Sequence, residues 1–332
     1  MNSKSSSDFF LSLDPPQWNW KLNHKDPVFL LGSCFSDSIG DRFVKYKFQT
    51  LINPYGTLYH PLALAQCLKD LLNNQSYQYD DLTQKDDQWF SWNHHGQFNS
   101  TDPDLVLKDI QRNVEEGHAF LKKAQLLVIT FGTAWTYRLN STGNRVANCH
   151  KVPASEFTKE LLTPEEIEKE WTPLLKDLQA FNPGLKIIFT VSPIRHIRDG
   201  IIENNRSKAA LIQATHQLVD QNPNREYFPA YEWIIDVLRD YRFFQTDRVH
   251  PSEEAVQFIW EQLTQSLFNQ ETQAWNQIID QILQGLNHRT NNPDSRAHQL
   301  FLEKLKQKMV AFQHSSGLSF EKELKRLKHQ KA

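Results

Sequence analysis

Short apolar runs that alternate with segments of helical periodicity are the feature that most restricts the fold of this chain. The three clearest runs are 27–31, 125–130 and 185–191, and turn-forming residues follow each of them. Runs of this length bounded by turn residues are typical of strands buried on both faces. Because strands that alternate with helices are joined by right-handed crossovers, the sequence predicts an α/β fold with a mostly parallel sheet.

Apolar spacing and capping residues predict the helices between these strands. Thr163 followed by Pro164 is a typical helix start. The polar, aromatic stretch 76–103 is expected to form a hairpin or a long loop. The first expected helix begins near Ser36. Further helices are expected at 62–72, 105–124, 163–181, 204–221, 231–239 and 251–268, and shorter strands at 50–52 and 226–228.

The chain length allows one large domain with an appendage. The 332 residues are 39% hydrophobic and 23% charged, an ordinary globular composition. We expect an N-terminal segment at 1–26, the α/β domain at 27–268 and a helical, basic C-terminal extension at 269–332. From Arg296 to Ala332 there are nine Lys or Arg against three Glu. We interpret this as a solvated amphipathic helix on the domain edge rather than as a contact for nucleic acid or a partner.

Composition also excludes several classes of protein. The formal net charge of −2 favours neither nucleic acid nor an anionic membrane. No apolar run approaches the ~20 residues of a spanning helix, and Met1–Phe10 does not resemble a secretory signal. Three cysteines, an odd number, are consistent with a reducing cytoplasm. The absence of both G-x-G-x-x-G and G-x-x-x-x-G-K-[ST] predicts that no nucleotide cofactor binds.

Unusual motifs follow the predicted strands, where parallel sheets gather their active groups. They are Gly32-Ser33-Cys34-Phe35, Asn53-Pro54-Tyr55-Gly56, Gly132-Thr133-Ala134-Trp135 and Ser192-Pro193. This coincidence is the main reason, from the residues alone, to expect an enzyme.

The Gly32-Ser33-Cys34-Phe35 turn places two nucleophiles before a predicted helix. Backbone N–H groups at a helix N-terminus stabilise a thiolate or an oxyanion. Cys34 and Ser33 are both candidates, although a buried structural thiol is the commoner role of a cysteine. Asp247 and His250 form a D-x-x-H pattern late in the chain, in which the Asp can orient the His as a base.

These motifs together resemble the GSCFA-domain family, which is placed among the SGNH/GDSL-type hydrolases. The resemblance runs from about Phe29 to about Phe268 and includes Asn148-Cys149-His150-Lys151, Ser192-Pro193-Ile194-Arg195-His196 and Asp240-Tyr241-Arg242-Phe243. It implies a three-layer α/β/α fold with flavodoxin-like topology.

The same resemblance implies roles for individual residues. Cys34 stands at the nucleophile position of the Gly-Asp-Ser block, with Ser33 at the Asp position. Gly56 matches the oxyanion glycine, and Asp247 and His250 match the last block. Ala134 stands where these hydrolases carry an oxyanion Asn. Asn53 or the Trp135 indole could replace that donor.

Further polar residues are candidates for lining the substrate cleft. They are Tyr59, Gly132, Thr133, His150, Arg195 and His196. Arg195 could bind a carboxylate or phosphate group of the substrate, or it could be the partner in a structural ion pair. A metal site using His94, His95, Cys149, His150 and His196 is an alternative, but no C-x-x-C or H-x-x-x-H spacing supports it.

Three functions therefore stay open. The first is an SGNH-like hydrolase or acyltransferase for an ester, thioester or acylated glycan, with Cys34 or Ser33 as nucleophile, His250 as base and Asp247 as its orienting residue. The second is a non-catalytic binding protein for an acylated or sugar ligand, because the third-block Asn is absent. The third is a metal-assisted hydrolase. The sequence leaves the substrate and the oligomeric state undetermined.

Overall fold

The computed structural model describes residues 11–288, 290, 292 and 294–329. The expectation that Met1–Phe10 is not a secretory signal therefore concerns residues outside the described ones. The first ten residues of the expected N-terminal segment and residues 330–332 of the expected extension lie outside them as well.

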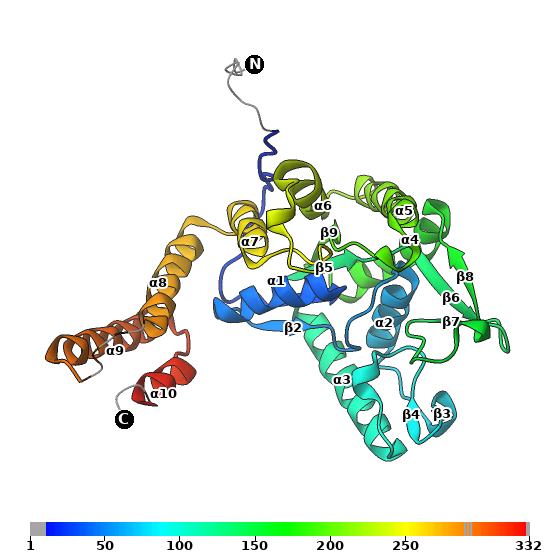
Figure 1. The fold of residues 1–332 in the computed structure, drawn as a ribbon, viewed down its shortest axis with the longest axis horizontal. Helices are drawn as coiled ribbons and strands as arrows, with labels where there is room; N and C mark the ends of the chain where they lie inside the picture. Colours follow the sequence, from blue (N-terminus) through cyan, green and yellow to red (C-terminus); the bar gives the residue numbers. More distant parts are fainter. Residues whose placement is uncertain (1–10, 289, 291, 293, 330–332) are drawn as a thin grey trace.

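A parallel sheet of five strands forms the centre of the molecule (Figure 1). Its order is β10-β9-β5-β1-β2. In chain order this is 2-1-3-4-5, the flavodoxin-like arrangement that the resemblance implied. The strands are β1 (Val28–Gly32), β2 (Thr50–Ile52), β5 (Leu126–Phe131), β9 (Lys186–Val191) and β10 (Arg225–Tyr227).

Helices cover both faces of this sheet, which gives the predicted three layers (Figure 1). Alternate strand residues point to opposite faces: Phe29 and Leu31 belong to one buried cluster, and Val28 and Leu30 to the other. The first face packs against α2 (Pro61–Asn73), α3 (Pro103–Lys123), α4 (Pro164–Phe181) and α5 (Ile201–Asp220). The second packs against α1 (Cys34–Lys45) and α7 (Glu253–Leu267).

The strand order creates a crevice between β1 and β5. The chain moves outward in opposite directions from these two neighbours, so the loops that follow them separate. Ligands of open α/β sheets bind at this switch point, beyond the carboxyl ends of the strands. Gly32 pairs with Thr130 in the register of β1 and β5, so the motifs after both strands lie at that edge.

Two smaller sheets lie outside the central parallel sheet. The stretch 76–103 contains the expected hairpin, β3 (Thr83–Lys85) with β4 (Gln88–Phe90). A three-stranded antiparallel sheet was not predicted: β6 (Trp135–Leu139), β7 (Arg145–Val146) and β8 (Phe157–Leu161). Its strands are largely half-exposed and mix charged with apolar residues, so the sequence has no apolar run there that would predict them. Short 3-10 helices lie at Tyr79–Asp81, Gly96–Phe98, Ala154–Glu156, Ile197–Asp199 and Tyr241–Phe243.

The predicted helix at 231–239 is only partly regular. One α-helical turn, α6 (Ala230–Glu232), continues as a π-helical segment at Trp233–Leu238. It ends at Arg239, whose backbone is left-handed with φ of 48°. Trp233 and Ile234 are buried in the hydrophobic cluster on the face of the sheet that α1 and α7 cover.

Three further helices extend to one side of the sheet domain (Figure 1). They are α8 (Gln270–Asn287), α9 (Arg296–Ser316) and α10 (Glu321–His329). Buried Leu286, Leu305, Met309 and Phe320 belong to their apolar interior. Tyr46 donates to Asp280 at 2.7 Å, and Lys47 pairs with Glu323 at 2.5 Å, which ties the extension to the end of α1.

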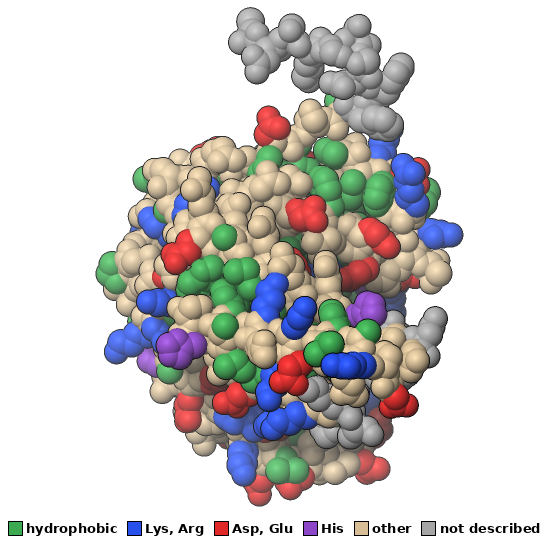
Figure 2. Space-filling view, turned by 90° about the vertical axis from the view of Figure 1, so that its left-hand side faces the viewer, with side chains coloured by type: hydrophobic (Ala, Val, Ile, Leu, Met, Phe, Trp, Pro, Cys, Tyr) green, Lys and Arg blue, Asp and Glu red, His purple; other side chains and the backbone are tan. Residues whose placement is uncertain are grey.

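The surface on this side carries both signs of charge. Figure 2 shows Lys and Arg side chains interspersed with Asp and Glu rather than gathered in one basic face. Among the described residues, no helix has the length and hydropathy to cross a membrane.

Candidate active site

The turn after β1 places Cys34 at the start of a helix. Gly32 has φ of 148°, and a Cβ there would lie 2.3 Å from the Thr130 carbonyl oxygen, so only glycine fits. The Ser33 hydroxyl caps α1 by accepting from the Phe35 N–H at 3.3 Å. Cys34 is the first residue of α1, and no described residue accepts a hydrogen bond from its N–H.

Cys34, His250 and Asp247 form a chain of contacts at this edge of the sheet. The Cys34 Sγ lies 3.9 Å from His250 Nε2, within the range of a hydrogen bond to sulfur. His250 Nδ1 lies 2.6 Å from Asp247 Oδ2. Ser33, in contrast, is 1% exposed and engaged in the helix cap. The imidazole therefore contacts Cys34 and not Ser33.

A short loop holds the Asp–His pair. Gln245 donates its N–H to the His250 carbonyl at 2.7 Å, and Phe244 bridges to Pro251. The second Asp247 oxygen accepts from the N–H groups of Val249 and His250, at 2.9 and 3.0 Å. The hydrogen bond with the His250 ring, together with these two backbone N–H groups, lowers the pKa of Asp247 to about 2, so its carboxylate stays ionised.

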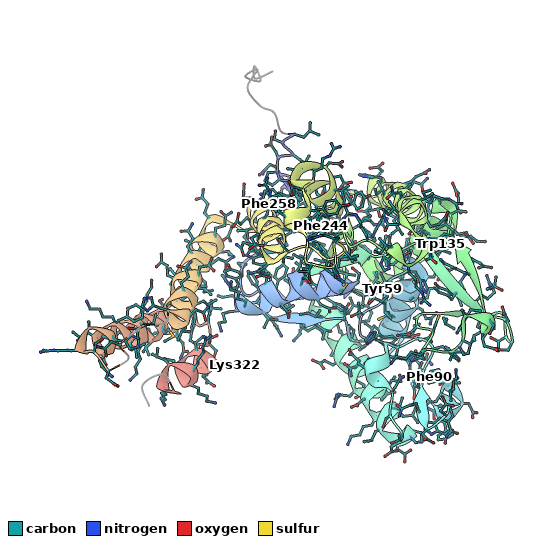
Figure 3. All side chains as sticks on the ribbon, in the orientation of Figure 1. Tyr59, Phe90, Trp135, Phe244, Phe258 and Lys322 are labelled. Carbon is teal, nitrogen blue, oxygen red and sulfur yellow. The ribbon has the colours of Figure 1, made fainter. Side chains whose placement is uncertain are left out.

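Cys34 and His250 line a cavity of about 430 Å³. Tyr59, Trp135 and Phe244 lie around the end of α1 that carries Cys34 (Figure 3). A larger cavity of about 640 Å³ between α2 and the antiparallel sheet contains neither Cys34 nor His250, so size alone does not mark the reactive centre. The lining of the Cys34 cavity includes Tyr59, Thr133, Trp135, Tyr137, Cys149, Ile194, Arg195, His196, Arg198 and Asp199.

Asn53 braces the nucleophile turn. Its Oδ1 accepts from the Gly32 N–H at 2.8 Å, and its Nδ2 donates to Asp37 at 2.6 Å. Thr57 donates to the other Asp37 oxygen at 3.0 Å. Asn53 is buried and is not among the residues that line the Cys34 cavity, so it braces the turn rather than facing a substrate oxygen.

Gly56 closes the turn that positions Asn53. It has φ of 72°, and a Cβ there would lie 2.3 Å from the Cβ of His95. Its N–H donates to the Asn53 carbonyl at 2.7 Å. Gly56 is not among the residues lining the Cys34 cavity, whereas Tyr59, three residues later, is.

The segment after β5 is likewise hydrogen-bonded within the chain. The N–H groups of Gly132 and Thr133 both donate to the Tyr59 carbonyl, at 2.8 and 3.0 Å. Ala134 donates its N–H to Ser207, and the Trp135 indole donates to the Glu203 carbonyl at 3.3 Å. The indole therefore does not stand free to replace the missing Asn.

Lys208 is a residue that the sequence analysis missed. It lies on α5, is 1% exposed, and donates to the carbonyls of Gly132 and Ser192, each at 2.6 Å. No carboxylate of the described residues pairs with it. Burial lowers the pKa of Lys208 to about 7, and the neighbouring Cys34 opposes that shift. The sequence around Lys208 looks like that of an exposed helix position, so it gives no local indication that this lysine is buried.

The thiol is not ionised by its surroundings alone. Burial raises the pKa of Cys34 above its ordinary value, and Asp37 adds to the rise. Lys208 and the N–H groups at the start of α1 oppose it. The balance favours a thiol that needs a base to become a nucleophile.

The histidines that the sequence analysis singled out do not lie together. His196 lines the Cys34 cavity with its ring 5.5 Å from that of Tyr59, and burial lowers its pKa to about 4. His150 instead stacks on Phe90 at 4.2 Å and lines a different cavity beside the β3–β4 hairpin. His94 is fully buried and stacks on Tyr55 at 4.0 Å. In the described parts of the chain, no three His, Cys, Asp or Glu side chains come together to hold a metal ion.

Two models of known protein families match most of this chain. Residues 27–263 match the model of the GSCFA family, and residues 279–331 match that of the GSCFA domain protein, C-terminal domain. The chain belongs to the GSCFA family. No curated protein matches it.

Two solved structures share part of the fold. A carbohydrate esterase family 3 protein from Talaromyces cellulolyticus is 11% identical with a TM-score of 0.33, and the match covers 77% of this chain and 99% of that one. An acetyl xylan esterase from the rumen bacterium Butyrivibrio proteoclasticus is 10% identical with a TM-score of 0.30, over 78% and 66% of the two chains. Similarity at this level carries no argument about activity.

Proposed function

We propose that this protein is a hydrolase or acyltransferase that acts on an ester, thioester or acylated glycan through Cys34, His250 and Asp247. The observation that carries the proposal is the unbroken series of contacts from Cys34 Sγ to His250 Nε2 and from His250 Nδ1 to Asp247. This series stands at the switch point of the sheet, beside a cavity large enough for a small acyl ligand.

The first half of the reaction forms an acyl-enzyme. His250 Nε2 takes the thiol proton, and Asp247 holds the imidazole in the required tautomer and stabilises its positive charge. The Cys34 sulfur attacks the acyl carbon and forms a tetrahedral oxyanion. When this collapses, the bond to the alcohol or thiol leaving group breaks, and the leaving group takes the proton from His250.

The second half releases the acyl group. Water, or the hydroxyl of an acceptor, loses its proton to His250 and attacks the thioester carbon. Collapse of the second tetrahedral oxyanion returns Cys34 to the thiol form, with the proton supplied by His250. Water gives hydrolysis and an acceptor hydroxyl gives acyl transfer.

The small number of oxyanion donors restricts which substrates are expected to react fast. The Cys34 N–H, at the positive end of α1, is a donor beside the sulfur for which the described residues supply no acceptor. Loss of one donor costs roughly 10²–10³ in rate where it has been tested. We therefore expect thioesters and activated esters to react faster than simple alkyl esters.

The engaged donors also favour a second candidate, a binding protein for an acylated or sugar ligand. Gly132, Thr133 and Trp135 all direct their N–H groups at the chain itself. Tight binding of such a ligand with no turnover over a broad acyl panel would select this alternative.

We propose, from the odd number of cysteines, that the protein works in a reducing compartment such as the cytoplasm.

The test is to trap the acyl-enzyme. The full chain is incubated with acetyl and butyryl thioesters and activated esters, and the adduct is located by mass spectrometry. We expect acylation at Cys34, no turnover by Cys34→Ala, and normal turnover by Cys67→Ala, since Cys67 is fully buried away from the cavity. Full turnover by Cys34→Ala would overturn the proposal.

A further inference from the structure

Two arginines on the wall of the Cys34 cavity have no carboxylate partner within the part of the chain that the structure describes. Arg195 and Arg198 both line the cavity, and neither forms an ion pair with a described residue. An arginine is always charged and is favoured where a planar anion is bound. Two such side chains beside a nucleophile need an explanation.

The acids near the cavity contact other groups. Asp199, which also lines it, lies 2.5 Å from Lys159. Asp247 lies 2.6 Å from the His250 ring and keeps its negative charge while that ring is neutral. Neither acid forms an ion pair with Arg195 or Arg198, so both guanidinium groups line the cavity without a directly paired carboxylate among the described residues.

Arg195 is held in place without a charged partner. Its Nη1 donates to the Arg248 carbonyl at 3.2 Å, and its guanidinium lies 4.2 Å from the centre of the Phe244 ring. A guanidinium has five N–H donors, and one of those of Arg195 has an acceptor among the described residues. The others are available for a carboxylate or phosphate, which a guanidinium binds through two parallel hydrogen bonds.

Arg198 reaches the same space from the next 3-10 turn. Its side chain is exposed. Burial raises the pKa of both Cys149 and Tyr137, two other residues of the cavity wall, and the charge of Arg198 opposes that rise. The rest of the wall is largely apolar or aromatic and includes Ile194 and Val249. The cavity thus combines a cationic pair with an apolar surface.

We infer that Arg195 and Arg198 form a subsite for an anionic group, a carboxylate or a phosphate, on the substrate whose acyl carbon is placed at Cys34. The acyl part of this statement rests on the proposed function, whereas the anion subsite does not. The substrate class is an acyl ester or thioester that carries a negative charge away from the reacting carbon.

The first test compares two alkylating reagents that differ in charge. Iodoacetate is anionic and iodoacetamide is neutral, and both label thiols. We expect the rate ratio of iodoacetate to iodoacetamide at Cys34 to exceed that of a free cysteine derivative. Arg198→Met should lower the ratio about two- to fivefold, the size expected for one nearby charge in a partly solvated site.

Controls separate the local charge from other effects. Arg198 makes no hydrogen bond within the described residues, so Arg198→Met is not expected to disturb the fold. Arg195→Lys keeps the charge and should keep the ratio, whereas Arg195→Met should lower it. Arg112→Met removes an exposed arginine of α3 outside the cavity and should leave the ratio unchanged. A wild-type ratio no higher than that of the free thiol would overturn the inference.

The second test does not depend on the thiol. Thermal unfolding of the full chain is measured at constant ionic strength with butyl phosphate, with pentanoate and with pentanol. We expect one or both anions, but not the alcohol, to raise the melting temperature of wild type and to lose this effect in Arg195→Met and Arg198→Met. A larger shift with butyl phosphate identifies a phosphate-bearing substrate, and a larger shift with pentanoate a carboxylate.

The two tests distinguish the two proposals. A Cys34 that reacts with neither reagent, together with an arginine-dependent thermal shift, would remove the nucleophile and keep the anion subsite. No thermal shift with either anion, or a shift retained by both methionine variants, would remove the subsite and leave the Cys34 reaction standing.

Discussion

The two sides of the candidate site are built differently. On the nucleophile side, Ser33, Asn53 and Lys208 are each less than 10% exposed and are hydrogen-bonded to backbone groups around the turn. On the base side, the Asp247 and His250 side chains are 45% and 44% exposed and stand on a short loop.

This difference separates a fixed element from an adjustable one. Buried, fully hydrogen-bonded groups move only when a large part of the core opens, whereas exposed loops open at a small free-energy cost. The Sγ–Nε2 distance of 3.9 Å is long for a catalytic hydrogen bond. Such contacts often tighten only when substrate binds. We expect the loop, and not the nucleophile turn, to provide that adjustment.

Removing the orienting carboxylate should have the largest effect. In Asp247→Asn the Oδ1 atom can still accept from the Val249 and His250 N–H groups, so the loop should keep its shape. The imidazole loses its anionic partner, and turnover should fall about a thousandfold. The measurement is kcat/KM on an activated thioester.

Asp240→Asn is the matched control. Asp240 caps the neighbouring 3-10 turn through the Arg242 N–H and has no contact with His250. It should keep turnover within about twofold, because its carboxylate lies outside the proton path. Equal losses in the two variants would mean that the loop, and not the carboxylate, matters.

Substitution of Asn53 should damage the buried side through stability. Asn53→Ala leaves the buried Gly32 N–H and one Asp37 oxygen without their partner, and we expect unfolding to become easier by about 3 kcal/mol. Asn53 also has a left-handed φ of 44°. Asn53→Gly removes the same hydrogen bonds but tolerates this backbone, so it should cost about 1 kcal/mol less.

Chemical denaturation measures both values. A loss of activity without a loss of stability in Asn53→Gly would instead give Asn53 a direct part in the chemistry.

Removing the buried charge should change the thiol itself. Lys208 lowers the pKa of Cys34, so Lys208→Met should raise it further. At neutral pH the rate of iodoacetamide labelling of Cys34 should then fall by up to about tenfold, because a smaller fraction of the thiol is ionised. The measurement is the pH profile of labelling.

Cys67 serves as an internal control for this variant, because a fully buried thiol stays unlabelled only while the fold is intact. A profile identical to that of wild type would show that Lys208 only ties the ends of β5 and β9 together.

Acid should destabilise the fold through two buried histidines, with no effect at neutral pH. Burial lowers the pKa of His60 to about 4 and that of His94 to about 3, against about 6.5 in the unfolded chain. The unfolded state therefore binds these protons first. The stability that these residues confer is complete above pH of about 6.5 and is lost progressively as the pH falls toward 3–4.

The variant that tests this is His94→Phe, which keeps a ring against Tyr55 but cannot titrate. It should reduce the slope of unfolding free energy against pH by at most about 1.4 kcal/mol per pH unit below pH 6. An unchanged slope would assign the acid sensitivity to other groups.

The sequence anticipated the parts of the site that follow from local patterns. The strand at 27–31 and the helix after it appear at Val28–Gly32 and Cys34–Lys45. The order of strands and helices predicted a parallel sheet, and the switch point then brings the Cys34 turn and the Gly132 segment to one edge. The Asp247–His250 contact follows from a separation of three residues on one loop.

Contacts made across the fold were beyond local patterns. The sequence could not distinguish Ser33 from Cys34, because the side chain that faces His250 depends on how α1 begins. It could not find Lys208, because a buried and an exposed lysine look alike within a helix. It offered Asn53 and Trp135 as oxyanion donors, but in the folded chain Asn53 Nδ2 donates to Asp37 and the Trp135 indole donates to the Glu203 carbonyl.

By itself, then, the sequence determined the class of fold and the residue types gathered at one edge of the sheet, because strand and helix periods and turn residues act over short distances. Only the tertiary structure decided which thiol or hydroxyl meets the imidazole, which donors remain free, and which charges go unpaired. Those outcomes depend on distances of a few ångströms between residues such as Cys34 and His250, 216 positions apart in the chain.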